Sequence, residues 1–336
     1  MVLNPYSEKA WDTTKIIHPN LQKQFAEVDA PTGTIATYKD DTGQITINTI
    51  YNNDGVFVAF HDCHIEEYHG DTKGNDVNGL LLNVYMLGSS TRISDSFSGE
   101  RLVGYGNVAR LWTSESYLKP HTKYIRSLAI VVLLNDFELT HHGDRWDEIV
   151  TGLMERYCQL HNKSFQFKLN ALLMSYCYAL DEMTHKNSID TRQIKEIVSY
   201  IFLELYSNDP EKIIIGASER YDIADRICED MLSCIRTECD LETIFERYGV
   251  NKYKANRLFK ERYGMPPYNF YRMHKLYRAA GLILLGENNM TKVAEMTGYE
   301  SPSKFAIVFR KIFGVRPKHF RGFVMERYQK MFSDMD

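Results

Sequence analysis

The sequence contains no CxxC pair, no secretory signal and no long apolar run, and each absence narrows the class of protein. A chain of 336 residues can build a core that is stable without disulfides, so its six cysteines are expected to be reduced thiols. The amino-terminal segment lacks a basic start followed by an apolar stretch, and no segment approaches the roughly eighteen apolar residues of a spanning helix. We therefore expect a cytoplasmic protein without a membrane partner.

Motifs of the common enzyme classes are also missing, because there is no glycine-rich phosphate loop, nucleophile elbow or HExxH sequence. The densest group of potential metal ligands is His61, Asp62, Cys63, His64, Glu66, Glu67 and His69. This group continues an expected strand, in which His61 and Cys63 would point to one face and His64 to the other. These three residues are weak candidates for a metal site, and we expect no cofactor.

Positive charge is scarce in the first part of the chain and concentrated near its end. Residues 236–330 hold 19 Lys and Arg against 9 Asp and Glu, a balance of +10. The remaining residues hold 40 − 19 = 21 against 44 − 9 = 35, a balance of −14. Such a basic end is typical of a segment that binds a polyanion, although charge alone fits a solvated basic surface equally well.

The spacing of apolar residues changes along the chain from strand-like to helical, which predicts a β-rich part followed by helices. Residues 33–140 contain several strand-like runs, with a hairpin signal at Asn52–Gly55 and apolar runs at Leu80–Leu87 and Leu128–Leu134. Three helical stripes follow, within residues 146–157, 169–180 and 194–205, and one of them is a candidate dimerisation helix. Residues 207–218 contain Asn-Asp-Pro and are the best linker candidate.

The last hundred or so residues contain an imperfect repeat with a period of about fifty residues. Phe259–Gly264 recurs as Phe309–Gly314, and a proline lies three residues after each glycine. A short helix that ends in glycine precedes each copy, at Leu241–Gly249 and at Thr291–Gly298. Helix, glycine turn and second helix therefore occur twice, which predicts two helix-turn-helix modules.

The segment between the two copies, Tyr268–Leu285, predicts a connecting helix with one apolar stripe and the basic residues Arg272, Lys275 and Arg278. At 1.5 Å per residue such a helix is about 27 Å long. Two modules held apart by it could reach successive major-groove faces of one duplex, which lie about 34 Å apart. A single chain could then contact two grooves.

Several spaced residues of the repeat can be compared with known families. They are the run Gly298-Tyr-x-Ser-x-Ser-x-Phe305 and Phe309–Pro317, with Val293-Ala294 before them and Ala279 with Leu282 on the connecting helix. In these positions the stretch 241–321, about a quarter of the chain, resembles the AraC/XylS family of transcription regulators. The resemblance implies a regulator whose partner is double-stranded DNA.

The resemblance implies which side chains contact the DNA bases, because they occupy the positions at which family members touch bases. In the first recognition helix they are Tyr253, Asn256 and Arg257, where Arg257 could bond two guanine acceptors and Asn256 could pair with adenine. In the second recognition helix they are Ser303 and Lys304. For each of them a solvated helix residue is the alternative interpretation.

A second set of residues is expected to contact the DNA phosphates. Such contacts position the protein without reading the base sequence. Asn251 and Ser301 are also the expected N-caps of the two recognition helices. The set comprises Asn251, Lys252, Lys260, Ser301, Arg310, Lys311 and Lys318.

The sequence departs from the family pattern at two positions. Phe245 stands where the family usually has a small alanine, and its bulk is expected to alter how the helices of the first module cross. Ile307 stands where many members have arginine, next to Ala306. Apolar groups at that place can contact only thymine methyl groups, so the second module is expected to discriminate bases less well than the first.

The resemblance also implies what the rest of the chain does. We expect an α+β protein with a barrel-like, β-rich effector-sensing and dimerisation domain at 1–218, β-rich to about residue 143, and an all-α DNA-binding domain at 219–330. Expected partners are a small-molecule effector, RNA polymerase and a second copy of the chain. The sequences of residues 249–254 and 301–303 are most similar to those of the siderophore-responsive, PchR-like branch of the family. Activation of transcription is the commoner behaviour of family members.

Two other functions remain open at this point. One is a metal-dependent β-barrel enzyme fused to a DNA-binding tail, which would use His61, Cys63 and His64. The other is a scaffold whose helices bind another protein. Neither explains the repeat.

Overall fold

The computed structural model describes residues 26–133 with short gaps (31–32, 41–42, 54, 66–67, 71–78, 95–96 and 112–115), 148–149, 152–153, 164–207 without 187, and 222–334. Strands come first: β1 (Ala26–Ala30), β2 (Gly33–Asp40), β3 (Gly43–Asn53), β4 (Val56–Ile65), β5 (Tyr68–Gly70), β6 (Gly79–Leu87), β7 (Ser90–Ser94), β8 (Phe97–Arg101), β9 (Tyr105–Leu111), β10 (Ser116–Pro120), β11 (Ile125–Leu133) and β12 (Ser164–Lys168). Helices follow: α4 (Ala171–Met183), α5 (Thr191–Ser207), α6 (Asp222–Ser233), α7 (Leu241–Arg247), α8 (Lys252–Tyr263), α9 (Pro267–Leu284), α10 (Met290–Met296), α11 (Pro302–Phe313), η2 (Pro317–His319) and α12 (Phe320–Ser333). The predicted α+β order is confirmed.

The strands form two antiparallel sheets. One has eight strands in the order β1-β2-β3-β4-β11-β6-β9-β12, and the other has four in the order β5-β10-β7-β8. The hairpin predicted at Asn52–Gly55 joins β3 to β4, and Gly55 takes a φ of 70°, a left-handed conformation that glycine adopts without strain.

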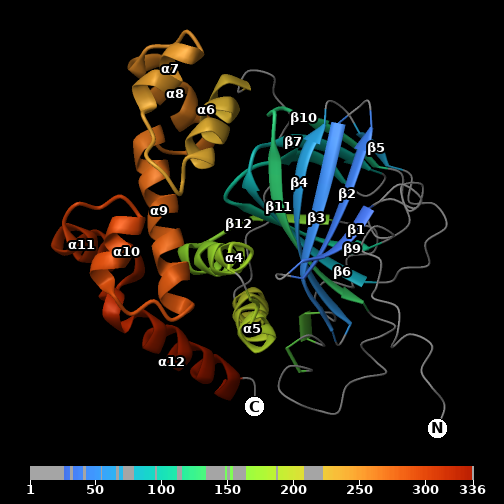
Figure 1. Cartoon of the computed structure of the whole chain (residues 1–336), viewed down its shortest axis with the longest axis vertical. Coiled ribbons are helices and arrows are strands. Elements are labelled where there is room, and N and C mark those ends of the chain that lie inside the picture. Colours follow the sequence, from blue (N-terminus) through green and yellow to red (C-terminus); the bar gives the residue numbers. More distant parts are fainter. Residues whose placement is uncertain are drawn as a thin grey trace.

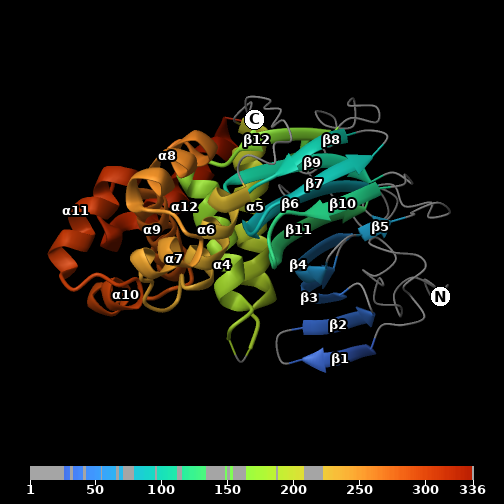
Figure 2. The same ribbon diagram turned by 90° about the horizontal axis from the view of Figure 1, so that it is seen from above.

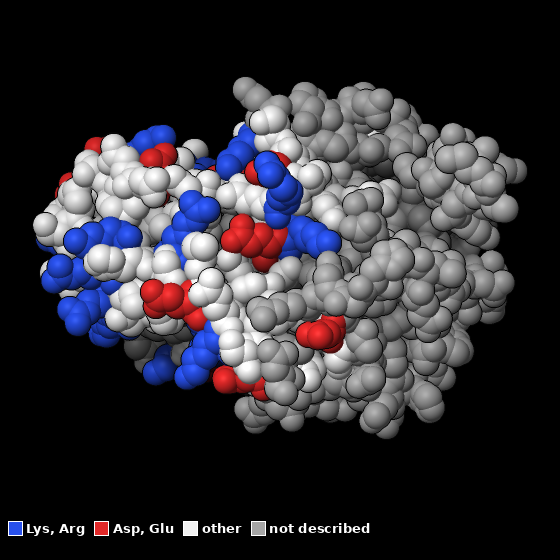
Figure 3. Space-filling model, turned by 90° about the horizontal axis from the view of Figure 1, so that it is seen from below, with Lys and Arg blue, Asp and Glu red and all other residues white. Residues whose placement is uncertain are grey.

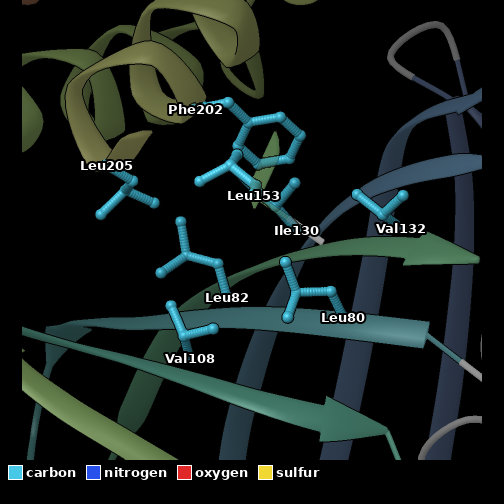
Figure 4. A pocket seen from close by; sticks show the side chains of 8 residues that line it. All are labelled: Leu80, Leu82, Val108, Ile130, Val132, Leu153, Phe202 and Leu205. Atoms are coloured by element: carbon cyan, nitrogen blue, oxygen red, sulfur yellow. The ribbon is translucent and has the colours of Figure 1, made fainter. Parts of the chain in front are cut away.

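The two faces of the eight-stranded sheet have different neighbours. On one face, Leu82 and Val108 lie opposite each other in the register and pack with Phe202 of α5 (Figure 4). The space left among these apolar side chains is about 10 Å³, which is too small for more than a single water. Where these described residues meet, this face is therefore packed core without room for a ligand.

The opposite face of the same sheet looks toward the four-stranded sheet. The Tyr85 hydroxyl of β6 lies 2.8 Å from the Ser90 hydroxyl of β7. The Gln166 amide nitrogen of β12 donates to the carbonyl oxygen of Glu100 on β8, also at 2.8 Å. We call this surface the inner face.

Helices α4 and α5 lie between the strands and the carboxy-terminal helices (Figures 1 and 2). The predicted stripe at 194–205 is confirmed, because Ile194, Ile197, Ile201 and Leu205 are buried on one side of α5. Most of the stripe at 146–157 lies outside the described residues. So does the linker candidate at 207–218, except for Ser207, which ends α5. Within the described part of the chain, no helix is both long and apolar enough to cross a membrane.

Candidate nucleic-acid interface

The two predicted helix-turn-helix modules are present as α7–α8 and α10–α11, at opposite ends of α9 (Figure 1). The glycines that separate the two helices of each module, Gly249 and Gly298, have φ values of 61° and 75°. Only glycine takes this left-handed conformation without strain, so the tight turn follows directly from the sequence.

Both recognition helices begin with the expected N-caps. The Asn251 side chain accepts a hydrogen bond from the Lys254 backbone N–H at 2.9 Å, and the Ser301 hydroxyl accepts one from the Lys304 N–H at 3.4 Å. Each cap satisfies one backbone donor of the first turn. Proline at position 302 adds a pre-set φ at the start of α11.

In the first recognition helix, α8, the buried side is made of Ala255, Leu258 and Phe259. On the opposite side the Tyr253 side chain is 78% exposed and Arg257 is exposed, whereas Asn256 is half-buried at the edge. The structure thus leaves the three predicted base-reading side chains accessible, although whether they contact bases remains a prediction.

In the second recognition helix, α11, three mutually tilted aromatic rings anchor the buried side: Phe305, Phe309 and Phe313, with centroid separations of 5.5 and 4.4 Å. Ser303 and Lys304 are exposed, and so is Ile307 at 71%. An isoleucine this exposed contributes little to the core, which is consistent with a position that faces the groove.

The basic residues predicted at the phosphates are all exposed: Lys252, Lys260, Arg310, Lys311 and Lys318. Figure 3 shows Lys and Arg side chains gathered on the helical part, at the end farthest from the strands. Lys254 on α8, Arg316 directly before η2 and Arg321 on α12 are further exposed cations that are not among the predicted contacts. Their positive charge in the sequence is the signal that could have found them.

The connecting helix, α9, runs from Pro267 to Leu284 as predicted. Of its three basic residues, Arg278 is not available to DNA, because its side chain is 5% exposed and pairs with Glu182 of α4. Arg272 donates to the Tyr299 hydroxyl at 3.3 Å, and the Lys275 ammonium lies over the ring of Tyr271.

The first recognition helix also has a buried cation that the sequence reasoning missed. Arg262, in the last turn of α8, bonds Asp225 of α6 at 2.7 Å and pairs with Glu100 of β8. The Ser89 hydroxyl donates to the same Asp225 carboxylate at 2.9 Å. The end of α8 is therefore held by α6 and β8, while the residues at its beginning, 251–254, are exposed.

The candidate metal ligands of β4 are divided between its two faces, as predicted. His61 and Cys63 are in register with Ser127 and Ile125, whereas Asp62 pairs with Arg126 and the His64 ring lies 4.7 Å from that of Tyr124. Burial lowers the pKa of His61 to about 4 and raises the pKa of Cys63 to about 12, so both are uncharged near neutrality. Among the described residues, no three potential ligands come together.

Comparison with known proteins agrees with this geometry. Residues 244–322 match the family described as a helix-turn-helix domain. The chain is 26% identical over 105 residues to a probable transcription factor, PqrA of Proteus vulgaris, a match that covers 30% of this chain and 86% of that protein. It is 28% identical over 110 residues to a putative HTH-type transcriptional regulator, YkgA of Escherichia coli K12, covering 31% of this chain and 45% of that protein.

Solved structures resemble the whole chain only distantly. ToxT from Vibrio cholerae O395 is 11% identical, with a TM-score of 0.30 over 81% of this chain and 99% of that one. The AraC-like transcriptional activator CuxR is 12% identical, with a TM-score of 0.34 over 90% of this chain and 88% of that one. Likeness at this level carries no argument about ligands or mechanism.

Proposed function

We propose that this chain is a DNA-binding transcription regulator of the AraC/XylS family that reads two successive major grooves with unequal modules. In this proposal α8 carries most of the base readout through Tyr253, Asn256 and Arg257. The second recognition helix, α11, contributes position and affinity through Ser303 and Lys304 and through the cations around it. The enzyme alternative has no support in the comparisons, and the proposed regulator acts by binding alone.

One observation carries the division of roles. Arg257 and Ile307 occupy equivalent positions of the repeat, fifty residues apart, and both are exposed. A guanidinium can bond two acceptors of guanine, whereas an isoleucine can contact only a thymine methyl group. The same contrast holds for Asn256 and Ala306. Discrimination between bases should therefore be concentrated in the half-site under α8.

The proposed organisation keeps the boundaries expected from the sequence. Residues 1–218 form an effector-sensing and dimerisation domain, and 219–330 form the DNA-binding domain. The proposed regulator activates transcription in the cytoplasm by recruiting RNA polymerase, and it responds to a small molecule.

The inner face of the eight-stranded sheet is the proposed effector site. Asn107 lies in register with Asn83 and Gln166 on this face, and it is 2% exposed. Among the described residues, neither polar atom of its amide has a hydrogen-bond partner, and the Gln166 Oε1 has none either. Buried amides without partners destabilise a core unless a ligand or water satisfies them. A polar effector between the two sheets would supply the missing bonds.

Selection of bound sequences from random duplexes by the full chain tests the DNA proposal. Two half-sites about one helical turn apart are expected, with the stronger base preference in one of them. Recovery of no sequence above random DNA, at low salt and with candidate effectors added, would contradict sequence-specific binding. Equal base preference in both half-sites would contradict the unequal roles.

Thermal unfolding of the full chain with added ligands tests the effector proposal. The probes are a ferric siderophore and a panel of polar metabolites. A ligand that binds the folded state raises Tm, and Asn107→Leu should abolish the rise. Asn48→Leu is the matched control, because Asn48 lies in register with Phe60, on the opposite face of the same sheet. Loss of the rise in the control alone would place the site elsewhere.

A further inference from the structure

A single carboxylate on α4 contacts arginines from two separate parts of the DNA-binding region. The Glu182 Oε1 atom accepts from Arg278 Nε of α9 at 2.6 Å and from Arg236 Nη1, in the link between α6 and α7, at 2.5 Å. The Glu182 side chain is 7% exposed. Removing this buried charge would leave the buried Arg278 guanidinium without its carboxylate partner and would leave Arg236 with Asp181 alone.

Arg278 also contacts the second module. Its Nη1 donates to the backbone carbonyl of Met296 at 2.7 Å. Met296 is the last residue of α10, directly before the turn at Thr297 and Gly298 that leads to the second recognition helix. The guanidinium therefore ties the turn of the second module to α9 while Glu182 fixes its orientation.

Arg236 lies in the segment that leads into the first module. It precedes α7 by a few residues, and its second nitrogen bonds Asp181 at 2.6 Å. Burial alone would raise the pKa of Asp181, but Arg126 and Arg236 together hold that pKa below its ordinary value. Both neighbouring carboxylates of α4 thus anchor the approach to the first module.

The helix that carries Glu182 is itself fixed tightly on α9. At Gly281 a Cβ atom would lie 2.7 Å from the Ala179 backbone nitrogen, so the two helices cross in backbone contact. The Tyr178 hydroxyl and the His274 Nδ1 lie 2.9 Å apart in the same interface. Figure 1 shows α4 against the lower part of α9, on the side away from α10 and α11.

We propose that Glu182 is a positioning residue for DNA reading: by holding Arg236 and Arg278 at once, it sets the orientation of one helix-turn-helix module relative to the other. The length of α9 fixes how far apart the modules are, but their rotation about this rod depends on where each is anchored. Both anchors meet at Glu182. A residue outside the DNA-binding domain would then determine which half-site spacing the regulator accepts. This inference rests on the proposed two-groove reading.

The test compares affinities of the full chain for the selected duplex and for the same duplex with five base pairs inserted between its half-sites, which rotates them by about half a turn. Wild-type protein should bind the altered duplex at least about tenfold more weakly, a ratio in the range usual for coupling between sites. For Glu182→Gln the ratio should fall below about threefold. Affinity for a duplex that carries one half-site should stay at its wild-type value.

Glu204→Gln is the matched control. Glu204 is also a buried glutamate that pairs with an arginine, at 2.5 Å, but its partner Arg327 lies on α12, beyond both modules. This variant should keep the wild-type ratio. If Glu182→Gln does not fold, as judged by circular dichroism, Arg278→Gln decides, because it breaks the same link from the other side.

Each outcome bears on one idea. A wild-type protein that binds both duplexes equally would overturn the two-groove proposal and, with it, the role of Glu182. A wild-type protein that prefers one spacing, together with a folded Glu182→Gln or Arg278→Gln variant that keeps the full ratio, would overturn the positioning role alone. Weakening of single half-site binding in step with the double site would mean that Glu182 only stabilises the fold.

Discussion

The side chains that distinguish the two recognition helices occupy matching positions of the repeat. Arg257 and Ile307 are both exposed, and the backbone around each is capped and terminated in the same way, by Gly264 and Gly314 with φ values of 79° and 77°. Because the frames are so similar, we propose that the difference in side-chain chemistry at this one position sets what each module can read.

Arg257→Ala should weaken binding to the selected duplex by about 1 to 3 kcal/mol and relax the preference at one base pair. The reason is the loss of two hydrogen bonds to a guanine edge. Repeating the selection with the variant measures both effects. Lys260→Ala, an exposed cation of the same helix, should instead weaken binding to all sequences alike. A uniform loss for Arg257→Ala would make it a phosphate contact.

The buried imidazole of His274 should make stability depend on pH. Burial lowers its pKa to about 3, whereas the unfolded side chain titrates near 6.5. Between these values the unfolded state binds a proton that the folded state does not, so stability is full above pH 6.5 and falls as the pH is lowered. The expected slope is about 1.4 kcal/mol per pH unit below roughly pH 6.

Urea unfolding at pH 7, 6 and 5 measures this contribution. The fall in the free energy of unfolding should be shallower in His274→Gln than in the wild type by that amount. Identical pH dependence in the two proteins would show that His274 titrates normally in the folded state.

Among the structural elements, the short-range features were predictable and the helix contacts were not. The caps, the turn glycines and the ends of α8, α9 and α11 follow from a few consecutive residues, because helix ends are set by local hydrogen bonds. The crossing of α4 and α9 does not. Gly281 resembles an ordinary weak point of a helix until Ala179, about a hundred residues earlier, is placed against it.

Gly281→Ala should lower the free energy of unfolding by about 1 to 3 kcal/mol, because the new methyl group would meet the backbone of α4. Gly322→Ala provides the contrast, since a Cβ on Gly322 of α12 meets nothing within 4 Å. The control should raise stability by about 0.5 to 1 kcal/mol through lower chain entropy. Stabilisation by both substitutions, measured in urea, would argue against close helix contact at Gly281.

For the molecule as a whole, the basic residues near the end of the chain divide into those that form ion pairs within the protein and those left exposed for DNA. The basic excess of residues 236–330 fits either a surface for a polyanion or a solvated basic surface. Several of its arginines instead pair with carboxylates of the strand domain and of α4 and α5: Arg236, Arg262, Arg278 and Arg327. The acidic first part of the chain thus neutralises one side of the basic part and leaves the other side for DNA.

The salt dependence of DNA binding should reflect only the cations that remain free. If Lys252, Lys260, Arg310, Lys311 and Lys318 each neutralise one phosphate, log K should fall with log salt with a slope of about −4 to −5. Replacing Lys311 with alanine should reduce the slope by about 1. Replacing Arg327 with methionine should leave it unchanged, because its charge is already paired. An equal change for both variants would contradict this division.

The sequence by itself determined the two helix-turn-helix modules, because caps, glycine turns and apolar repeats act over a few residues. It also indicated which side chains of α8 and α11 are exposed. Only the tertiary structure decided which arginines are available to bind DNA, because the carboxylates that pair with the others are far away in the chain. Glu182 and Arg278 are 96 residues apart, and Glu204 and Arg327 are 123 residues apart. An ion pair exists only where folding brings both charges together, and no local pattern encodes that meeting.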